Sequence, residues 1–154
     1  MSYLLEGEVS FDSSHYLRGH KGKCRNLHGH RWRICYGIKS DKLISNGSSE
    51  GMIIDFSHMK YLVNEYFETY DHALIVTKDK DGFSKEEERF IKSCRDMNFK
   101  MVEIPCRSTA ENMSRIFFCE LGDMISKKIG DENIIVDYIT VYETPSNAAT
   151  YREE

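Results

Sequence analysis

Residues 29–39, GHRWRICYGIK, alternate between two kinds of side chain. One side of the alternation is apolar or aromatic and consists of Trp32, Ile34, Tyr36 and Ile38. A period of two residues is typical of a strand with one buried face. Residues 3–12, YLLEGEVSFD, have the same period. The N-terminal part of the chain therefore predicts two strands, which can pair as a hairpin.

Helical periodicity dominates the middle of the chain. Apolar residues recur at steps of three and four in residues 57–69, and again from Thr109 to about Ile129. A shorter amphipathic helix is expected between these two. Capping boxes mark the start of the second and third helices, Ser84 with Glu87 and Ser108 with Glu111.

Two further strands are predicted, FKMVEI at residues 99–104 and NIIVDYITVYE at residues 133–143. Strands at both ends of the chain and helices in its middle indicate an α+β fold, with an antiparallel sheet and helices packed on one face. A chain of 154 residues buries about 70% of its unfolded surface as one domain. We therefore expect a single domain over residues 1–154.

The composition excludes several classes of protein. Twenty-one basic and 25 acidic residues give a formal charge of -4, which argues against a dedicated nucleic-acid binder. Glu6 and Glu8 stand where a signal peptide needs an apolar core, and no apolar run approaches the roughly 20 residues that span a bilayer. Five cysteines without a C-x-x-C pair predict neither a disulfide framework nor a zinc knuckle. We expect a cytosolic protein.

The stretch CRNLHGH, residues 24–30, places His28 and His30 two positions apart where the second strand begins. Both imidazoles then leave the same face of the strand and can converge on one ion. His15, just past the first strand, is the nearest third candidate ligand if the strands pair. Three imidazoles with an open position are typical of a catalytic zinc site. A surface pair or a hydrogen-bonded core pair of histidines remains the alternative.

The same histidines share parity with Trp32 and Ile34. An unbroken strand would therefore point them into the apolar layer. A β-bulge near Gly29 would relieve this conflict, and the sequence does not show whether one forms.

Cys24 lies in a local run of cationic residues with no acid between Asp12 and Asp41. The run consists of Arg18, Lys21, Lys23 and Arg25, with His20 among them. Nearby cations favour the thiolate, so Cys24 is the cysteine most suited to act as a base or nucleophile. The same charges would attract an anionic substrate such as a phosphate ester. A flexible basic loop with an incidental thiol is the alternative.

Asp71 and His72 adjoin at the end of the first predicted helix. An adjacent carboxylate can orient an imidazole and raise its basicity, which gives a general acid or base near neutral pH. The alternative is a histidine that is favoured at a helix C-terminus by the dipole alone.

Glu143 ends the last predicted strand and shares a face with Ile139 and Val141. A carboxylate on an apolar face is costly unless it binds something, for example the paired N–H groups of a guanidine-like heterocycle edge. A strand-end glutamate in solvent is the alternative.

Six motifs in order resemble the 6-pyruvoyltetrahydropterin synthase and 6-carboxytetrahydropterin synthase family. They are FDSSHYL (11–17), CRNLHGH (24–30), GMIIDF (51–56), DHALI (71–75), STAEN (108–112) and YET (142–144). The resemblance covers residues 11 to about 152, and residues 78–104 form a longer connection than compact members of the family have.

The resemblance implies a role for each candidate residue. It implies zinc ligation by His15, His28 and His30, a catalytic thiolate at Cys24, a proton relay by Asp71 and His72, and pterin binding by Glu143 with help from Thr109. It also implies the tunnelling fold, in which sheets from three subunits close a barrel and two trimers form a homohexamer.

The implied substrate is 7,8-dihydroneopterin triphosphate. Three residues separate Cys24 from His28, as in the 6-carboxytetrahydropterin synthases of queuosine and deazapurine biosynthesis. We therefore expect a lyase that forms the carboxy product and releases acetaldehyde and triphosphate. Three alternatives remain: a 6-pyruvoyltetrahydropterin synthase, a non-catalytic pterin- or purine-binding protein, and an interaction protein that uses its sheet edges.

Overall fold

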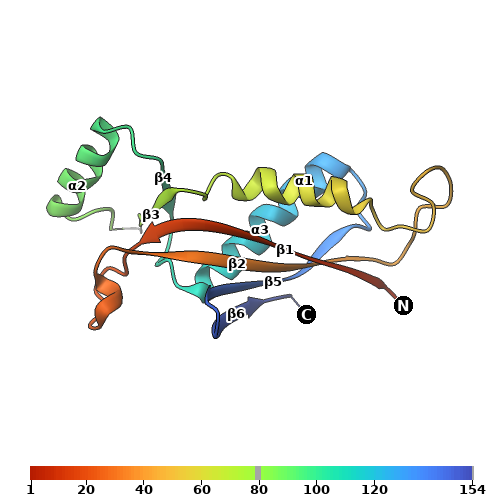
Figure 1. Ribbon diagram of the computed structural model, residues 1–154, viewed down its shortest axis with the longest axis horizontal. Helices are drawn as coiled ribbons and strands as arrows, with labels where there is room; N and C mark the ends of the chain where they lie inside the picture. Colours follow the sequence, from red (N-terminus) through yellow and green to blue (C-terminus); the bar gives the residue numbers. More distant parts are fainter. Residues whose placement is uncertain (79–80, 154) are drawn as a thin grey trace.

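The computed structural model describes residues 1–78 and 81–153. The strands are β1 (Tyr3–His15), β2 (His28–Ser40), β3 (Ala73–Thr77), β4 (Met101–Ile104), β5 (Ile135–Thr144) and β6 (Asn147–Tyr151). The helices are the short 3-10 helix η1 (Lys23–Arg25), α1 (Phe56–Phe67), α2 (Lys85–Asp96) and α3 (Ala110–Ile129). Figure 1 shows β1 and β2 running the length of the molecule, with α1 and α3 on one side of them.

The six strands form one sheet in the order β4-β3-β1-β2-β5-β6. The predicted hairpin is confirmed, since β1 and β2 pair antiparallel from Tyr3 opposite Ser40 to His15 opposite His28. Strands β5 and β6 continue the antiparallel order. The α+β class is thus confirmed, but the sheet is mixed, because β3 joins the end of β1 in parallel and β4 joins β3 in parallel.

Strands β3 and β6 were not predicted, each for a physical reason. All five residues of β3, ALIVT, are buried, so this strand lacks the polar and apolar alternation of a half-buried strand. The sequence of β6, NAATY, contains only one large apolar residue. Short strands of these two kinds leave little pattern in a single sequence.

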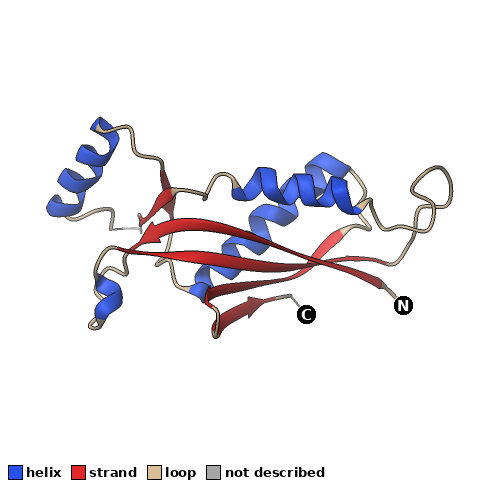
Figure 2. Ribbon diagram, in the orientation of Figure 1, coloured by secondary structure: helices blue, strands red, loops and turns tan. Residues whose placement is uncertain are grey.

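The main core lies between the sheet and helices α1 and α3 (Figure 2). Phe11 and Trp32 face each other across β1 and β2, and their ring centroids are 6.4 Å apart. Phe67 of α1 and Phe117 of α3 complete this aromatic cluster, with centroids 5.5 and 6.1 Å from that of Phe11. Helix α2 stands apart at the far end of the sheet. No helix in the described ranges combines the length and the apolar character needed to cross a bilayer.

The β-bulge near Gly29 that would relieve the conflict of parity does not form. Pairing between β1 and β2 continues through Gly29, opposite Ser14, without a shift in register. The shift in β2 occurs instead between Gly37 and Ile38, against β5. No relief was needed at Gly29, because the helix-covered face changes from apolar side chains to imidazoles as the strands end.

Helix capping agrees with the sequence at α2 and differs at α3. Ser84 and Glu87 form the predicted capping box of α2. At α3 the N-cap is Thr109, whose side chain accepts from the backbone N–H of Asn112, so the predicted box of Ser108 with Glu111 is wrong. The reason is that the hydroxyl of Ser108 contacts the ring of His15.

Candidate functional site

The strand register brings three histidines to one end of the core layer. On the helix-covered face, Phe11 lies opposite Trp32, Ser13 opposite His30, and His15 opposite His28. Side chains two positions apart on a strand share a face, so the layer passes from aromatic to imidazole within two residue pairs. The shared face that seemed to conflict with metal binding is therefore what places all three rings together.

The three imidazoles are mutually adjacent. Their ring centroids are 4.6 Å apart for His15 and His28, 5.1 Å for His15 and His30, and 4.9 Å for His28 and His30. Each Nε2 atom is buried and lacks a hydrogen-bond partner among the described residues. Native proteins rarely leave buried polar atoms unpaired, so three such atoms in one place indicate that something else binds them.

Backbone carbonyls orient two of the rings. The Nδ1 atom of His28 lies 2.6 Å from the carbonyl oxygen of Asn26, and Nδ1 of His15 lies 3.1 Å from that of Ser108. A carbonyl oxygen can only accept, so Nδ1 of each ring carries the proton and donates it. The Nε2 atom of a neutral ring then presents its lone pair to the group, as a metal ligand must.

Glu143 completes the group from β5. One ligand atom from each of His15, His28, His30 and Glu143 lies within 4.8 Å of the others. Glu143 Oε1 is 2.9 Å from His30 Nε2 and 3.5 Å from His15 Nε2. Burial is the main cause that lowers the pKa of His30, whereas the close contact with His15, followed by the fields of the imidazoles, lowers the pKa of Glu143.

These directions describe neutral His30 beside an ionised carboxylate. The close approach of His30 Nε2 to Glu143 lacks hydrogen-bond geometry. Neutral nitrogen lone pairs and a carboxylate oxygen that converge without a donor between them are a donor set for a cation. Imidazole nitrogen with carboxylate oxygen suits zinc and other first-row divalent metals.

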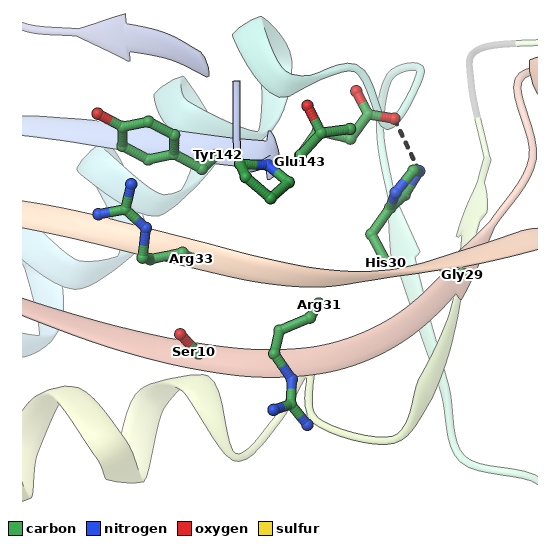
Figure 3. A pocket seen from close by; sticks show the side chains of 9 residues that line it. Ser10, Gly29, His30, Arg31, Arg33, Tyr142 and Glu143 are labelled. Atoms are coloured by element: carbon green, nitrogen blue, oxygen red, sulfur yellow. Dashed lines mark ion pairs between the residues drawn. The ribbon is translucent and has the colours of Figure 1, made fainter. Parts of the chain in front are cut away.

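A pocket of about 470 Å³ borders this group. In Figure 3, His30 and Glu143 point toward each other at one side of it, and Arg33 lies beside the ring of Tyr142 at the other. The guanidinium carbon of Arg33 is 3.8 Å from the centroid of that ring. The volume lies within the range of small-molecule sites, which is about 300–1,000 Å³. The candidate metal group therefore lies beside space for a ligand.

Asp71 and His72 form the pair that the sequence predicted. Nδ1 of His72 lies 2.6 Å from Oδ2 of Asp71, whose Oδ1 accepts from the backbone N–H of Asp12. That N–H bond is the largest cause that lowers the pKa of Asp71, with His72 adding to it. The side chain of His72 is 79% exposed, so its ring is free to exchange protons with a ligand or water.

Asp71 and His72 lie next to the face of the sheet that is turned away from the helices. Its neighbour Asp12 accepts two hydrogen bonds from Arg31, at 2.9 and 2.8 Å. Asp12 and Arg31 alternate with Phe11, His30 and Trp32, so they project away from the helices. No contact among the described residues joins His72 to the imidazoles of His15, His28 and His30.

The remaining candidates lie on loops. Cys24 is half-buried in η1, and its carbonyl accepts from the backbone N–H of Leu17. Cys24 is not part of the group of His15, His28, His30 and Glu143 found among the described residues. Thr109 is half-buried at the start of α3, directly after the Ser108 that contacts His15.

The sequence profile described as 6-pyruvoyl tetrahydropterin synthase matches residues 5–154. The chain belongs to this family. Within it, the 6-carboxy-5,6,7,8-tetrahydropterin synthase of Haemophilus influenzae is 34% identical over 152 residues, which cover 98% of this chain and 99% of the relative. The protein of the same name from Rickettsia felis is 32% identical over 142 residues, 90% of this chain and 91% of its own.

Solved structures have the same fold. An uncharacterised protein from Wolinella succinogenes superposes with a TM-score of 0.74 at 20% identity, covering 100% of this chain and 99% of the other. A catalytic-residue variant of 6-pyruvoyltetrahydropterin synthase from Plasmodium vivax, in which a glutamate is replaced by cysteine, gives 0.69 at 22% identity, covering 99% and 98%. The pterin synthase fold that the motifs implied is thus confirmed.

Two features of the site escaped the sequence. Ser108 was interpreted as a helix cap and instead contacts His15 across 93 positions of chain. Glu143 was expected to hold a heterocycle, whereas the structure also joins it to the imidazoles. The parity of Glu143 with Val141 was the available signal, because it places the carboxylate on the helix-covered face.

Proposed function

We propose that this chain is a zinc-dependent lyase that converts 7,8-dihydroneopterin triphosphate to 6-carboxy-5,6,7,8-tetrahydropterin, with release of acetaldehyde and triphosphate. The observation that carries the proposal is the group of three imidazoles, whose buried Nε2 atoms are unpaired beside Glu143. The full-length similarity to proteins named 6-carboxy-5,6,7,8-tetrahydropterin synthase supports the carboxy product. The proposal places the chain in queuosine and deazapurine synthesis.

His15, His28 and His30 are the proposed zinc ligands. Three histidines fit a catalytic zinc, because they leave a position for substrate or water. Zinc bound there would supply a Lewis acid to the oxygens of the substrate side chain.

Glu143 is assigned to the pterin. Its carboxylate lies at the border between the imidazoles and the pocket, where it can accept from the paired N–H groups of the amino-pyrimidine edge. Thr109, beside the Ser108 that orients His15, is assigned to the same ligand.

Cys24, Asp71 and His72 are assigned to proton transfer. The Cys24 thiolate removes a carbon-bound proton beside the pterin, and His72 returns or relays protons while Asp71 orients its ring. The 2.6 Å contact from Asp71 to His72 supports this relay. In the basic loop, Lys21, Lys23 and Arg25 are exposed and available to a triphosphate, whereas Arg18 is bonded to Glu87.

Assembly into trimers would complete the site. Among the described residues, one edge of β1 is unpaired over residues 3–11. One edge of β6 pairs with β5, and its other edge is unpaired among the same residues. Strands β1, β2, β5 and β6 alternate in direction, so β6 of one copy can pair antiparallel with β1 of the next, and a ring closes by rotation. Such a ring brings the face of the sheet away from the helices, with Asp71 and His72 next to it, toward neighbouring copies.

Two trimers would then form a hexamer. The end of the sheet away from the histidines exposes large apolar side chains, namely Tyr3, Leu4, Ile44, Met52 and Phe56. Exposed apolar groups that gather in this way are typical of an interface between proteins.

The test is incubation of the purified protein with 7,8-dihydroneopterin triphosphate, followed by mass analysis of the pterin and an acetaldehyde assay. The proposal expects one acetaldehyde for each carboxy-pterin, and about one zinc per chain. A pyruvoyl pterin without acetaldehyde would identify a 6-pyruvoyltetrahydropterin synthase. Binding of the pterin without turnover would identify a non-catalytic binding protein. Full turnover by Cys24→Ala would show that a residue other than Cys24 is the base.

A further inference from the structure

Residues 81–104, named here the brace, contain α2 and β4. Strand β4 pairs with β3, which pairs with β1 from Ser13 to His15, so the brace adjoins the end of the sheet that carries the histidines. A small core, separate from the main one, lies between the brace and strand β3. Its buried members are Leu74, Val76, Ile91 and Cys94, with Tyr16, Phe83 and Met101 packed against them. Tyr16 directly follows His15 along the chain, so the brace packs against the segment that leaves the candidate metal group.

Glu87 of α2 holds the start of the loop that carries Cys24. Its Oε1 atom accepts from the hydroxyl of Tyr16 at 3.0 Å and from Nε of Arg18 at 2.9 Å. The guanidinium of Arg18 also donates to the carbonyl oxygens of Gly82 and Thr77. The ion pair is mostly buried, with exposures of 29% for Arg18 and 13% for Glu87. Charge-assisted bonds in such a place are stronger than those of an exposed pair.

The hold on Tyr16 and Arg18 extends to Cys24. Leu17, between these two residues, donates its backbone N–H to the carbonyl oxygen of Cys24 at 2.8 Å. This bond closes the loop and joins Cys24 to Leu17, whose two chain neighbours are the residues that Glu87 binds.

Lys100 holds the second catalytic segment. Its ammonium donates to the carbonyl oxygen of Asp71 at 2.8 Å and to that of Glu68 at the C-terminus of α1. The following residue, His72, has a φ of 55°. Residues other than glycine seldom adopt this conformation, and surrounding contacts must maintain it. Lys100 and the bond from His72 N–H to the Asp12 carbonyl oxygen are two such contacts.

We propose that the brace positions both catalytic segments, through Glu87 for the loop of Cys24 and through Lys100 for the turn of Asp71 and His72. Glu87 and Lys100 are positioning residues, since each acts through a residue assigned to proton transfer. The inference rests on the proposed function for the roles of Cys24 and His72. It gives residues 81–104, part of the longer connection, a role in positioning the reacting groups.

The first experiment compares Tyr16→Phe and Glu87→Gln with Lys92→Gln, which breaks the exposed pair of Lys92 and Asp96 on the same helix. Alkylation by iodoacetamide is followed at each cysteine by peptide mass analysis, together with kcat and KM. Displacement of a catalytic group by about 1 Å can cost on the order of 100-fold in rate, so we expect kcat to fall by about 10-fold with KM within twofold. Cys24, half-buried at present, should be alkylated several-fold faster.

Cys94 supplies an internal reference, because it is buried beneath α2. Unfolding of the brace would accelerate alkylation of Cys94, whereas displacement of the loop alone accelerates only Cys24. Tyr16→Phe removes a single hydroxyl and preserves the ring in its core, so it remains informative if Glu87→Gln does not fold. Turnover and Cys24 alkylation that both match Lys92→Gln would overturn the role of Glu87.

The second experiment compares Lys100→Met with Lys100→Arg and with Lys92→Met. We expect Lys100→Met to lower kcat by about 10-fold and to shift the pH profile of kcat, because the turn that pairs Asp71 with His72 loosens. Lys100→Arg should restore part of the rate, since it keeps a cationic donor. An unchanged pH profile in Lys100→Met would refute the role of Lys100. If the wild-type protein shows no turnover, the proposed function fails, while Cys24 alkylation still tests the brace.

Discussion

The chain holds its histidines in two contrasting ways. His15, His28 and His30 lie on paired strands of the helix-covered face, and the side chain of His15 is fully buried. His72 lies on a turn with a positive φ, and its side chain is 79% exposed. The first group is suited to hold an ion in a fixed place, whereas the second is suited to exchange protons. Position relative to the sheet, rather than residue type, separates the two proposed roles.

The supports of the two groups differ as well. The register of β1 and β2 over 13 residue pairs, with backbone carbonyls behind two rings, holds His15, His28 and His30. The turn of Asp71 and His72 has no such strand register behind it, and bonds with Asp12, Phe67 and Lys100 hold it. Substitutions in the first region should therefore weaken metal binding, and those in the second should lower turnover while metal binding is retained.

The largest effect is expected for His30→Ala. Loss of one ligand should weaken zinc binding by more than about 100-fold, because loss of a hydrogen-bond partner behind a ligand already costs about 10- to 100-fold. Turnover should fall to background. Zinc content after equilibrium dialysis, measured by mass spectrometry, tests the loss. His58→Ala, at an exposed histidine of α1, is the matched control and should retain full zinc. Full zinc in His30→Ala would exclude this ligand.

Asp71→Asn should separate the two regions. We expect kcat to fall by about 100-fold or more, because a general acid or base typically contributes about 10²–10⁴-fold, while zinc content stays that of the wild type. Steady-state kinetics with zinc analysis of the same sample measures both. Asp96→Asn, at an exposed aspartate of α2, provides the control. If Asp71→Asn lost zinc as His30→Ala does, the separation of the two regions would be wrong.

Ser108→Ala should produce a smaller change in the buried region. The hydroxyl of Ser108 lies 2.9 Å from Nδ1 of His15, and its removal leaves the carbonyl oxygen at 3.1 Å as an acceptor. Zinc affinity should fall by about 10-fold, the lower end for loss of such a partner. Competition with a fluorescent zinc chelator measures it. Ser114→Ala removes another buried hydroxyl, one that bonds to the Glu111 carbonyl oxygen, and should leave the affinity unchanged.

The smallest effect concerns acid stability. The backbone N–H of Asp12, followed by His72, lowers the pKa of Asp71 from its ordinary 3.8. The ionised carboxylate therefore stabilises the folded chain above pH 3.8, and this contribution is lost as pH falls through the lowered pKa. The difference in unfolding free energy between wild type and Asp71→Asn should shrink in acid, as pH falls through this lowered pKa. Urea unfolding with a chelator present tests this, and a pH-independent difference would contradict it.

Local patterns predicted a large part of this structure. Alternation in residues 3–12 and 29–39 identified the hairpin, and the spacing of His28 and His30 identified two ligand candidates. Such patterns are readable because strand parity is set by neighbouring residues. Ser108 and β3 were misread or missed, because their roles depend on partners far along the chain or on burial from both sides.

The sequence by itself determined which side chains share a face, which helices form and which family the motifs resemble, since each depends on spacing along the chain. Only the tertiary structure decided that the apolar layer ends in imidazoles, that Glu143 joins them, and that α2 holds the loop of Cys24. The physical reason is that strand register and helix packing bring together groups distant in sequence, and no local period encodes which distant groups will meet.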